Sequence, residues 1–188
     1  MKAGFVVEKM KNIGLKSQKS RFNRMCIGEA LIELLKEKEL KNIKISHVVK
    51  KAGVSRTTFY KHYNTLEEVL YDYMNEIVAD YTIQRKDSFK MNSLYDYETI
   101  LFTFQFFDHY ADFFIIINKN NMYTILIDAI NRFMTRYFYS NRYNLYELYC
   151  YSGGILNIFI QWEERGKKET PEEMARIVYN VYHHLEKT

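Results

Sequence analysis

The sequence predicts an all-α protein of about nine helices, with a three-helix head at the N-terminal end and a larger helical domain behind it. Hydrophobic residues make up 47% of the 188 residues and charged residues 27%, a balance typical of a globular chain. One proline and seven glycines leave few breaks, which favours long helices over a turn-rich β protein. Apolar residues recur every three or four positions along most of the chain, as they do on the buried face of a helix.

The chain opens with a basic segment, residues 1–17, which we expect to form an N-terminal arm. A helix is predicted over residues 18–38 from its apolar stripe. That stripe contains Phe22, Cys26, Ile27, Ala30, Leu31, Leu34 and Leu35. The start of the chain has no long apolar segment, and no apolar run reaches the length of a membrane span. We therefore expect a cytoplasmic protein with no membrane partner.

Two short helical segments, 45–52 and 55–62, follow with a glycine between them. Val48 and Val49 lie on the apolar side of the first segment, and Phe59 lies on the apolar side of the second. Gly53 can adopt the positive φ of a tight turn, and Ser55 is a favourable N-cap for the second segment. This pattern is that of a helix-turn-helix at about residues 44–63, within a DNA-binding domain over residues 18–64.

The charge distribution supports a polyanionic partner for the N-terminal part. Residues 1–64 contain 15 Lys and Arg against 5 Asp and Glu, a net charge of +10. Residues 65–188 contain 12 Lys and Arg against 18 Asp and Glu, a net charge of −6. A basic surface can also be merely solvated, but here it coincides with a helix-turn-helix, and the combination favours DNA.

Residues 65–188 are predicted to form an effector-binding and dimerisation domain. A capping box of Thr65 and Glu68 opens a helix that runs to about Gln84, and residues 85–93 are predicted to be a loop. The aromatic-rich segment 94–118 is predicted to be a buried helix broken near Tyr110. Further helices are predicted over residues 122–139, 144–165 and 172–186, the last opened by a capping box of Thr170 and Glu173.

Several short motifs in the head resemble those of a known family. Ala52-Gly53-Val54-Ser55, Thr58-Phe59-Tyr60 and His62-Tyr63 follow one another as in the N-terminal DNA-binding domain of TetR-type transcriptional regulators, and the resemblance covers roughly residues 18–80. It implies a homodimer that binds an inverted-repeat operator in double-stranded DNA, and a repressor that is released by a small aromatic or apolar effector in the rear half. It equally allows an activator or adaptor whose rear half binds a protein partner instead, and both alternatives stay open here.

Arg56, at the start of the second short helix, is the best candidate for reading sequence, because a guanidinium can bind O6 and N7 of guanine together. Tyr60, Lys61 and, by the resemblance, His62 are expected to contact phosphates. Arg21 and Arg24 are further candidates for the DNA backbone. The residues expected at the DNA are Lys44, Ser46, Ser55, Arg56, Thr57, Thr58, Tyr60, Lys61 and His62.

Two positions depart from the family pattern. Lys44 stands where a Thr or Ser often caps the first short helix, and we expect Ser46 to substitute for it. The start of the next helix reads Asn64-Thr65-Leu66, without the cation that often meets a phosphate there. We expect that phosphate contact to come from Lys61 or from the helix N-terminus.

The rear half offers weaker signals. Residues 95–139 hold 14 of the 31 aromatic residues, which can line an effector pocket or simply fill the core. The residues chosen for the pocket are Phe102, Phe106, Tyr110, Phe133 and Tyr137. The segment 144–165 is apolar nearly all round, and it contains two adjacent glycines, which suggests a four-helix dimer interface with 172–186. The residues chosen for that interface are Gly153, Gly154, Asn157, Ile158, Gln161, Ile177 and Val181.

No motif in the sequence indicates catalysis. We find no nucleophile elbow, P-loop, dinucleotide fingerprint or paired zinc motif, so we expect no enzyme activity, no cofactor and no metal. His109 has Asp108 and Asp112 nearby, but nothing else completes a ligand set. An all-α enzyme on the same scaffold is the competing hypothesis, and it would need titratable groups that converge in one cavity.

Overall fold

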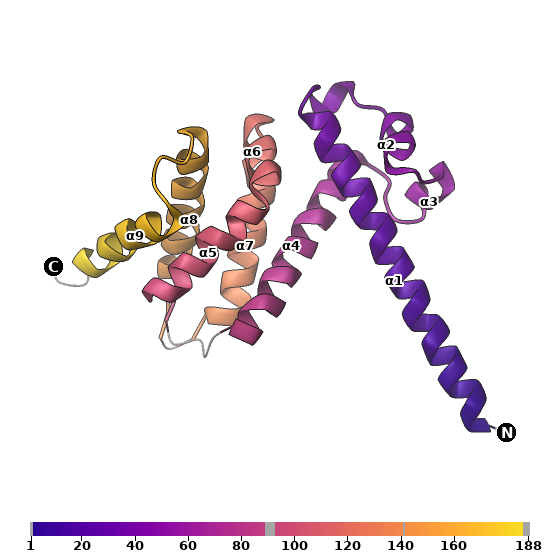
Figure 1. The fold of residues 1–188 in the computed structure, drawn as a ribbon, viewed down its shortest axis with the longest axis horizontal. Coiled ribbons are helices and arrows are strands. Elements are labelled where there is room, and N and C mark those ends of the chain that lie inside the picture. Colours follow the sequence, from indigo (N-terminus) through magenta and orange to yellow (C-terminus); the bar gives the residue numbers. More distant parts are fainter. Residues whose placement is uncertain (1, 89–92, 141, 186–188) are drawn as a thin grey trace. The chain divides into compact units, whose positions relative to one another are not determined.

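The computed structural model describes residues 2–88, 93–140 and 142–185, with the backbone alone at 2–17, 86–88, 184 and 185. The chain divides into two compact units, Met1–Tyr73 and Met74–Thr188. The described residues form nine α-helices and one short 3₁₀ helix, and their only β-type pairing is an isolated bridge between Ser140 and Tyr143 (Figure 1). The all-α prediction is therefore confirmed.

The first unit is built on four helical elements and the start of a fifth. These are α1 (Lys2–Leu35), the 3₁₀ helix η1 (Leu40–Asn42), α2 (Ile45–Ala52), α3 (Arg56–Tyr60) and the first two turns of α4 (Leu66–Ser88). Their apolar faces meet in a small core in which Ile27, Leu31, Val48, Phe59 and Leu70 are completely buried. Burying one such side chain contributes about 1.5–3 kcal/mol, which is how a five-residue helix such as α3 is held in place.

Two helices of the structure are longer than the sequence predicted. α1 begins at Lys2 and not at residue 18, so the predicted arm is helical, and no proline interrupts its sequence. α4 continues to Ser88, beyond the predicted end at Gln84, so Arg85 lies on a helix and not in a loop. The rest of the predicted loop includes residues 89–92, which lie outside the described residues.

The second unit contains the rest of α4 and five more helices. These are α5 (Tyr97–His109), α6 (Ala111–Lys119), α7 (Tyr123–Phe138), α8 (Leu145–Glu164) and α9 (Pro171–Leu185). α5 packs along α9, and α7 packs along α8 (Figure 1). The chain bends by 73° between α5 and α6, so the predicted break near Tyr110 is confirmed. Among the described helices no single one is both long and apolar enough to cross a membrane, although the bent pair α5–α6 has the length and composition when taken together.

Aromatic rings fill the core between α5, α6 and α8. Phe104, Phe107 and Phe114 lie around Phe159 with ring centroids 5.4–6.3 Å from it. Trp162 extends this cluster, since its indole is 5.7 Å from the Phe104 ring and only 4% exposed. Its Nε1–H donates a 3.0 Å hydrogen bond to the carbonyl of Glu169, which satisfies the one polar atom of the buried indole.

The helix ends follow the capping residues in the sequence. At α9, Thr170 Oγ1 accepts from the N–H of Glu173, and the Glu173 carboxylate accepts from the N–H of Thr170. This reciprocal pair confirms the predicted capping box. Gly166, which has a φ of 83°, follows the end of α8 as predicted. The start of α8 carries a second reciprocal box that the sequence reading missed, between Asn144 and Glu147.

Candidate functional site

The helix-turn-helix of the first unit is formed by α2, a glycine turn and α3. Gly53 has φ 67° and ψ 26°, the left-handed conformation that lets α2 end sharply. Ser55 then caps α3, because its Oγ accepts a 3.0 Å hydrogen bond from the N–H of Thr58. Phe59 anchors α3 in the core with no exposed surface, and its ring lies 5.6 Å from that of Tyr63. The short helix is thus fixed at both ends.

Most of the predicted DNA-contacting residues lie on the surface. The exposed ones are Lys44, Ser55, Arg56, Thr57, Tyr60 and Lys61, and the half-exposed ones are Ser46, Thr58 and His62. Tyr60 is 57% exposed even though its neighbour Phe59 is completely buried. α3 therefore presents a polar face with one arginine, one lysine and one phenol, which are groups that can bind bases and phosphates.

Two of those residues already have a structural role. Ser55 Oγ and Thr58 Oγ1 lie 2.9 Å apart, and Ser55 Oγ also accepts from the N–H of Thr58. The two hydroxyls thus close the first turn of α3. Any bond from them to DNA would be an additional bond to the same oxygens, which have lone pairs left.

The cap of α2 differs from the one we expected. Lys44 occupies the N-cap and its side chain makes no capping hydrogen bond. Nδ1 of His47 accepts a 3.2 Å hydrogen bond from the N–H of Lys44. His47, which we did not single out, therefore provides the reciprocal half of a cap, whereas no capping bond from Ser46 is described. The Lys44 ammonium is left on the surface beside α2.

Asp72 on α4 joins three parts of the first unit. Nη1 of Arg24 on α1 lies 2.6 Å from Oδ1 and 2.7 Å from Oδ2 of Asp72. The hydroxyl of Tyr63, just after α3, donates to Oδ2 at 2.6 Å. Arg24, which we considered for the DNA backbone, is therefore bound to a carboxylate inside the unit, whereas Arg21 is exposed.

His62 lies at the end of α3, next to Lys61. Its partial burial, and then the positive charges of Lys61 and Arg24, lower the pKa of its imidazole below the usual 6.5. The ring is therefore neutral at pH 7, and it can meet a phosphate only through the N–H of one tautomer. Binding to a phosphate would favour its protonated form.

The start of α4 has no cation, and the backbone N–H groups of Asn64 and Glu68 are already bound. Thr65 Oγ1 accepts from the N–H of Glu68 at 3.2 Å, as predicted for the cap. The Glu68 carboxylate accepts from the N–H of Asn64 at 2.7 Å, one residue before the expected partner. These bonds use donors that a phosphate would need, and Glu67 and Glu68 add negative charge. Lys61 is the better candidate for the phosphate contact.

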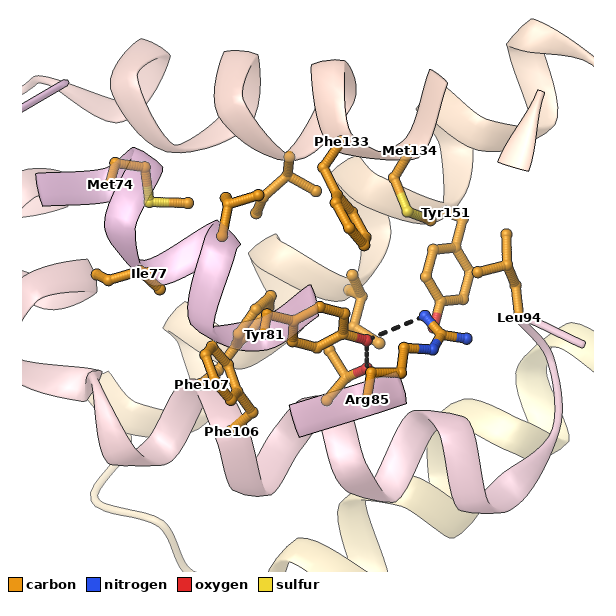
Figure 2. A pocket seen from close by; sticks show the side chains of 14 residues that line it. Met74, Ile77, Tyr81, Arg85, Leu94, Phe106, Phe107, Phe133, Met134 and Tyr151 are labelled. Carbon is orange, nitrogen blue, oxygen red and sulfur yellow. Dashed lines mark hydrogen bonds between the residues drawn. The ribbon is translucent and has the colours of Figure 1, made fainter. Parts of the chain in front are cut away.

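The second unit contains a cavity of about 40 Å³ between α4, α5, α7 and α8 (Figure 2). Most of its wall is apolar, with aromatic rings from Phe106, Phe107 and Phe133. Its polar groups gather at one end, where Tyr81, Arg85, Thr103 and Tyr151 line it. A second, more polar cavity of about 260 Å³ is also lined by Arg85, and its lining includes Ser93, Ser140 and Arg142.

The structure places the five predicted pocket residues in different surroundings. Phe106 and Phe133 line the inner cavity, and Tyr137 lines the outer one. Phe102 packs behind the cavity, with its ring 5.3 Å from that of Tyr81. Tyr110 donates a 2.7 Å hydrogen bond to Asp80.

The sequence does not predict the polar end of the cavity. It predicts a loop at Arg85, and it predicts helices at Tyr81 and Tyr151 with no role in a pocket. The spacing of Tyr81 and Arg85 by four residues would have placed them on one helix face, had α4 been extended.

Comparison with known proteins agrees with this architecture. A TetR-type family model, described as a transcriptional regulator C-terminal region, matches residues 96–184. The second unit is therefore similar to the C-terminal region of TetR-type transcriptional regulators. No curated protein matches it in sequence.

Solved structures share the fold over most of the chain at low identity. Lin0861 from Listeria innocua has a TM-score of 0.73 and 14% identity, over 89% of this chain and 93% of that one. A TetR transcriptional regulator from Rhodococcus has a TM-score of 0.57 and 17% identity, over 87% and 96%. The regulator FadR from Bacillus subtilis, solved in complex with stearoyl-CoA, has a TM-score of 0.57 and 16% identity, over 84% and 96%.

The residues chosen for a dimer interface lie on α8 and α9. Asn157 and Gln161 are exposed on α8, and Ile158 is half-buried. Ile177 and Val181, one turn apart on α9, are each 48% exposed. The two glycines differ, because a Cβ at Gly153 would meet nothing within 4 Å, whereas one at Gly154 would lie 2.9 Å from the hydroxyl of Tyr182. Gly154 thus allows a close approach within the chain itself.

Proposed function

We propose that this chain is a homodimeric repressor of the TetR family, which binds an inverted-repeat operator through α3 and is released by a small effector in the cavity of its second unit. The observation that carries the proposal is the surface of α3. Arg56, Tyr60 and Lys61 are exposed on a helix that Ser55 caps and Phe59 anchors, in a head with a net charge of +10. A dimer would present two such helices about 34–36 Å apart, in successive major grooves.

Arg56 is the proposed base reader, and Tyr60 with Lys61 are the proposed phosphate contacts. A bidentate arginine–guanine pair contributes about 1–3 kcal/mol of discrimination, whereas a lysine–phosphate contact contributes sequence-independent affinity that falls with salt. The two roles are therefore separable by experiment.

Release by an effector requires that the ligand bind the DNA-free state more tightly than the DNA-bound state. The apolar cavity with polar groups at one end is a suitable binding site for such a ligand. FadR from Bacillus subtilis, which shares this fold, was solved with stearoyl-CoA bound. That ligand belongs to FadR, and the effector proposed here is a different, smaller molecule.

The test is a binding assay against operators selected from a random double-stranded pool. Arg56→Ala is expected to weaken the selected palindrome by about 1–3 kcal/mol and to relax the preference at one base pair in each half-site. Lys61→Ala is expected to weaken binding to all DNA sequences alike. It should also reduce the slope of log affinity against log salt by about the contribution of one phosphate contact. Arg165→Ala, an exposed arginine on the second unit, is the matched control. Unchanged sequence preference in Arg56→Ala would remove it from the reader role, and no binding at low salt would contradict the proposal.

A second candidate function is an activator or adaptor whose second unit binds a protein partner. The volume of the inner cavity favours it, because about 40 Å³ holds only a few water molecules. This candidate predicts DNA binding by the same face of α3 and no ligand-dependent release, together with a stable complex between the second unit and a partner protein.

A further inference from the structure

Arg85 is a buried cation that faces the inner cavity without an anion to neutralise it. Its side chain is 4% exposed, and no ion pair joins it to any carboxylate among the described residues. Its Nη2 is buried with no hydrogen-bond partner in the part of the chain that the structure describes. A guanidinium cannot lose its proton to escape this cost, and a buried charge is unfavourable unless it is paired. Among the described residues this charge thus has no anion, and a bound anion would stabilise it.

The guanidinium is held in a fixed position by the side chains around it. Nη1 donates to the Tyr81 hydroxyl at 3.2 Å, and the Tyr81 and Thr103 hydroxyls lie 2.9 Å apart. Because Thr103 donates its own proton to the carbonyl of Thr99, Tyr81 must donate to Thr103 and accept from Arg85. The Phe138 ring lies 4.8 Å from the guanidinium carbon and supplies a cation–π contact.

Tyr151 provides a second unused donor beside Arg85 (Figure 2). Its hydroxyl is buried and makes no hydrogen bond of normal geometry with the described residues, although the Thr103 hydroxyl is close enough to lower its pKa by a smaller amount than burial raises it. Burial, reinforced by the neighbouring phenols of Tyr81 and Tyr182, raises the pKa of Tyr151 well above 10, so the group remains a protonated donor. Two buried donors without acceptors thus lie at the same end of one cavity.

The cavity beyond these donors is apolar, and Arg85 also borders the outer polar cavity. Arg85 therefore lies at the boundary between an apolar space and a polar one, and Tyr151 lines the apolar space. One guanidinium and one phenol suit a singly charged, planar oxyanion, and the apolar wall suits a hydrocarbon or aromatic body.

We propose that the inner cavity binds a small monocarboxylic acid, with its carboxylate on Arg85 and Tyr151 and its apolar body among the side chains of α4, α5, α7 and α8. Because the cavity of about 40 Å³ is smaller than such a ligand, binding requires these side chains to move apart, and the flexible Met74 and Met134 of the lining suit that movement. This inference rests on the proposed function, because it names the chemical class of the effector. It does not depend on which genes the protein regulates or on the operator sequence.

The test compares acids with neutral molecules of the same shape, by isothermal titration calorimetry on the full chain at pH 7.5. Hexanoate and phenylacetate are the acid probes, and hexanamide and phenylacetamide are the neutral ones. Each acid is expected to bind at least tenfold more tightly than its amide, since a hydrogen bond to a charged group contributes about that factor or more. Equal binding of acid and amide to the wild-type protein would overturn the inference without any variant.

Variants locate the site. Arg85→Gln is expected to abolish the preference for the acid, whereas Arg132→Gln, on the exposed face of α7, is expected to keep it. Tyr151→Phe removes a single oxygen and should weaken the acid about threefold to tenfold, with the amide changed less. If circular dichroism shows that Arg85→Gln does not fold, the acid and amide affinities of Tyr151→Phe serve as the test of the site. A preference for the acid that survives in Tyr151→Phe and in a folded Arg85→Gln would overturn the assignment.

DNA release is measured separately with the same probes. Arg85-dependent binding of the acids without any change in operator affinity supports the ligand class and counts against release by this ligand. Release by a neutral apolar molecule, which binds Arg85→Gln as tightly as wild type, supports the repressor and overturns the present inference.

Discussion

The hydroxyl of Tyr63 donates a 2.6 Å hydrogen bond to the carboxylate of Asp72, which Arg24 also binds. Through Asp72 the residue Tyr63, just after α3, is therefore bonded to α4, and Arg24 bonds α1 to the same carboxylate. A hydrogen bond to a charged, half-buried group is stronger than one between neutral groups. The orientation of α3 in the first unit therefore depends on a carboxylate that itself lies outside the helix-turn-helix.

Tyr63→Phe tests this bond. The substitution leaves the ring in the core and removes only the oxygen, so the free energy of unfolding is expected to fall by about 1–2 kcal/mol, as Asp72 keeps Arg24 as a partner. Chemical denaturation followed by circular dichroism measures it. Tyr60→Phe is the matched control, because Tyr60 is 57% exposed and its oxygen makes no described bond within the chain. A loss as small as that of the control would show that the Tyr63 bond adds no stability.

Gly28 allows α1 and α4 to approach closely in the first unit. A Cβ at this position would lie 3.1 Å from Cγ and Cε2 of Tyr73 and closer still to Cδ2. Tyr73 is only 9% exposed, so its ring has little space to move. Gly28→Ala is therefore expected to destabilise the protein by about 1–3 kcal/mol.

Rescue by a second substitution separates this clash from other effects of the alanine. In the double variant Gly28→Ala, Tyr73→Leu the smaller side chain leaves room for the new methyl. The two destabilisations should therefore sum to more than the loss in the double variant, which thermal or chemical denaturation measures. Strict additivity would mean that the two side chains do not meet.

His62 predicts opposite effects of acid on folding and on DNA binding. The pKa of His62 in the folded protein lies below the ordinary 6.5 that it has in the unfolded chain. At a pH between these two pKa values the unfolded chain therefore binds more protons than the folded one. The contribution of His62 to stability is complete above about pH 6.5 and is lost as the pH falls through the folded pKa. A phosphate beside the ring favours the protonated form, so operator binding should strengthen over the same fall in pH.

The measurement compares wild type with His62→Gln between pH 5.5 and 7.5, by denaturation and by fluorescence anisotropy of labelled operator DNA. The variant is expected to have the flatter profile in both experiments. An identical pH dependence of operator binding in the two proteins would remove His62 from the phosphate contacts.

Ile177 and Val181 test the proposed dimer. Both are half-exposed and lie on one face of α9, so a dimer that uses this face would bury them. Glutamate at both positions is expected to weaken the dimer by at least about 2 kcal/mol, or roughly thirtyfold, and sedimentation velocity measures the change. Ile83→Glu is the control, since Ile83 is 56% exposed on α4 and outside the predicted interface. A dimer that tolerates both glutamates would place its interface elsewhere.

Much of the fold could be predicted because helix starts and stops are encoded locally. Gly53 turns the chain through its own φ, and Ser55 caps α3 with its own hydroxyl. Thr170 with Glu173 opens α9 in the same way. Each of these depends on a few adjacent residues, which a single sequence contains.

Errors arose where no such local signal marks a boundary. α1 extends beyond its predicted start through a segment that contains Gly4 and Gly14, and α4 extends beyond Gln84 through Arg85 and Lys86. Neither a glycine nor polarity alone therefore defines a helix boundary. Because the predicted helix ends at Gln84, the sequence also fails to predict the polar end of the cavity, which requires Arg85 to lie on α4. Tyr151, from a helix 66 residues further along the sequence, meets Arg85 only through tertiary packing, which no local pattern predicts.

The buried indole of Trp162 gives this protein a built-in optical reporter. It is the single tryptophan of the sequence, and it lies in the second unit against Phe104 and Phe159. Intrinsic emission excited at long ultraviolet wavelength therefore originates in that unit alone. A change in this emission when operator DNA is added would show that an event at the first unit is felt in the second, with no label attached to either.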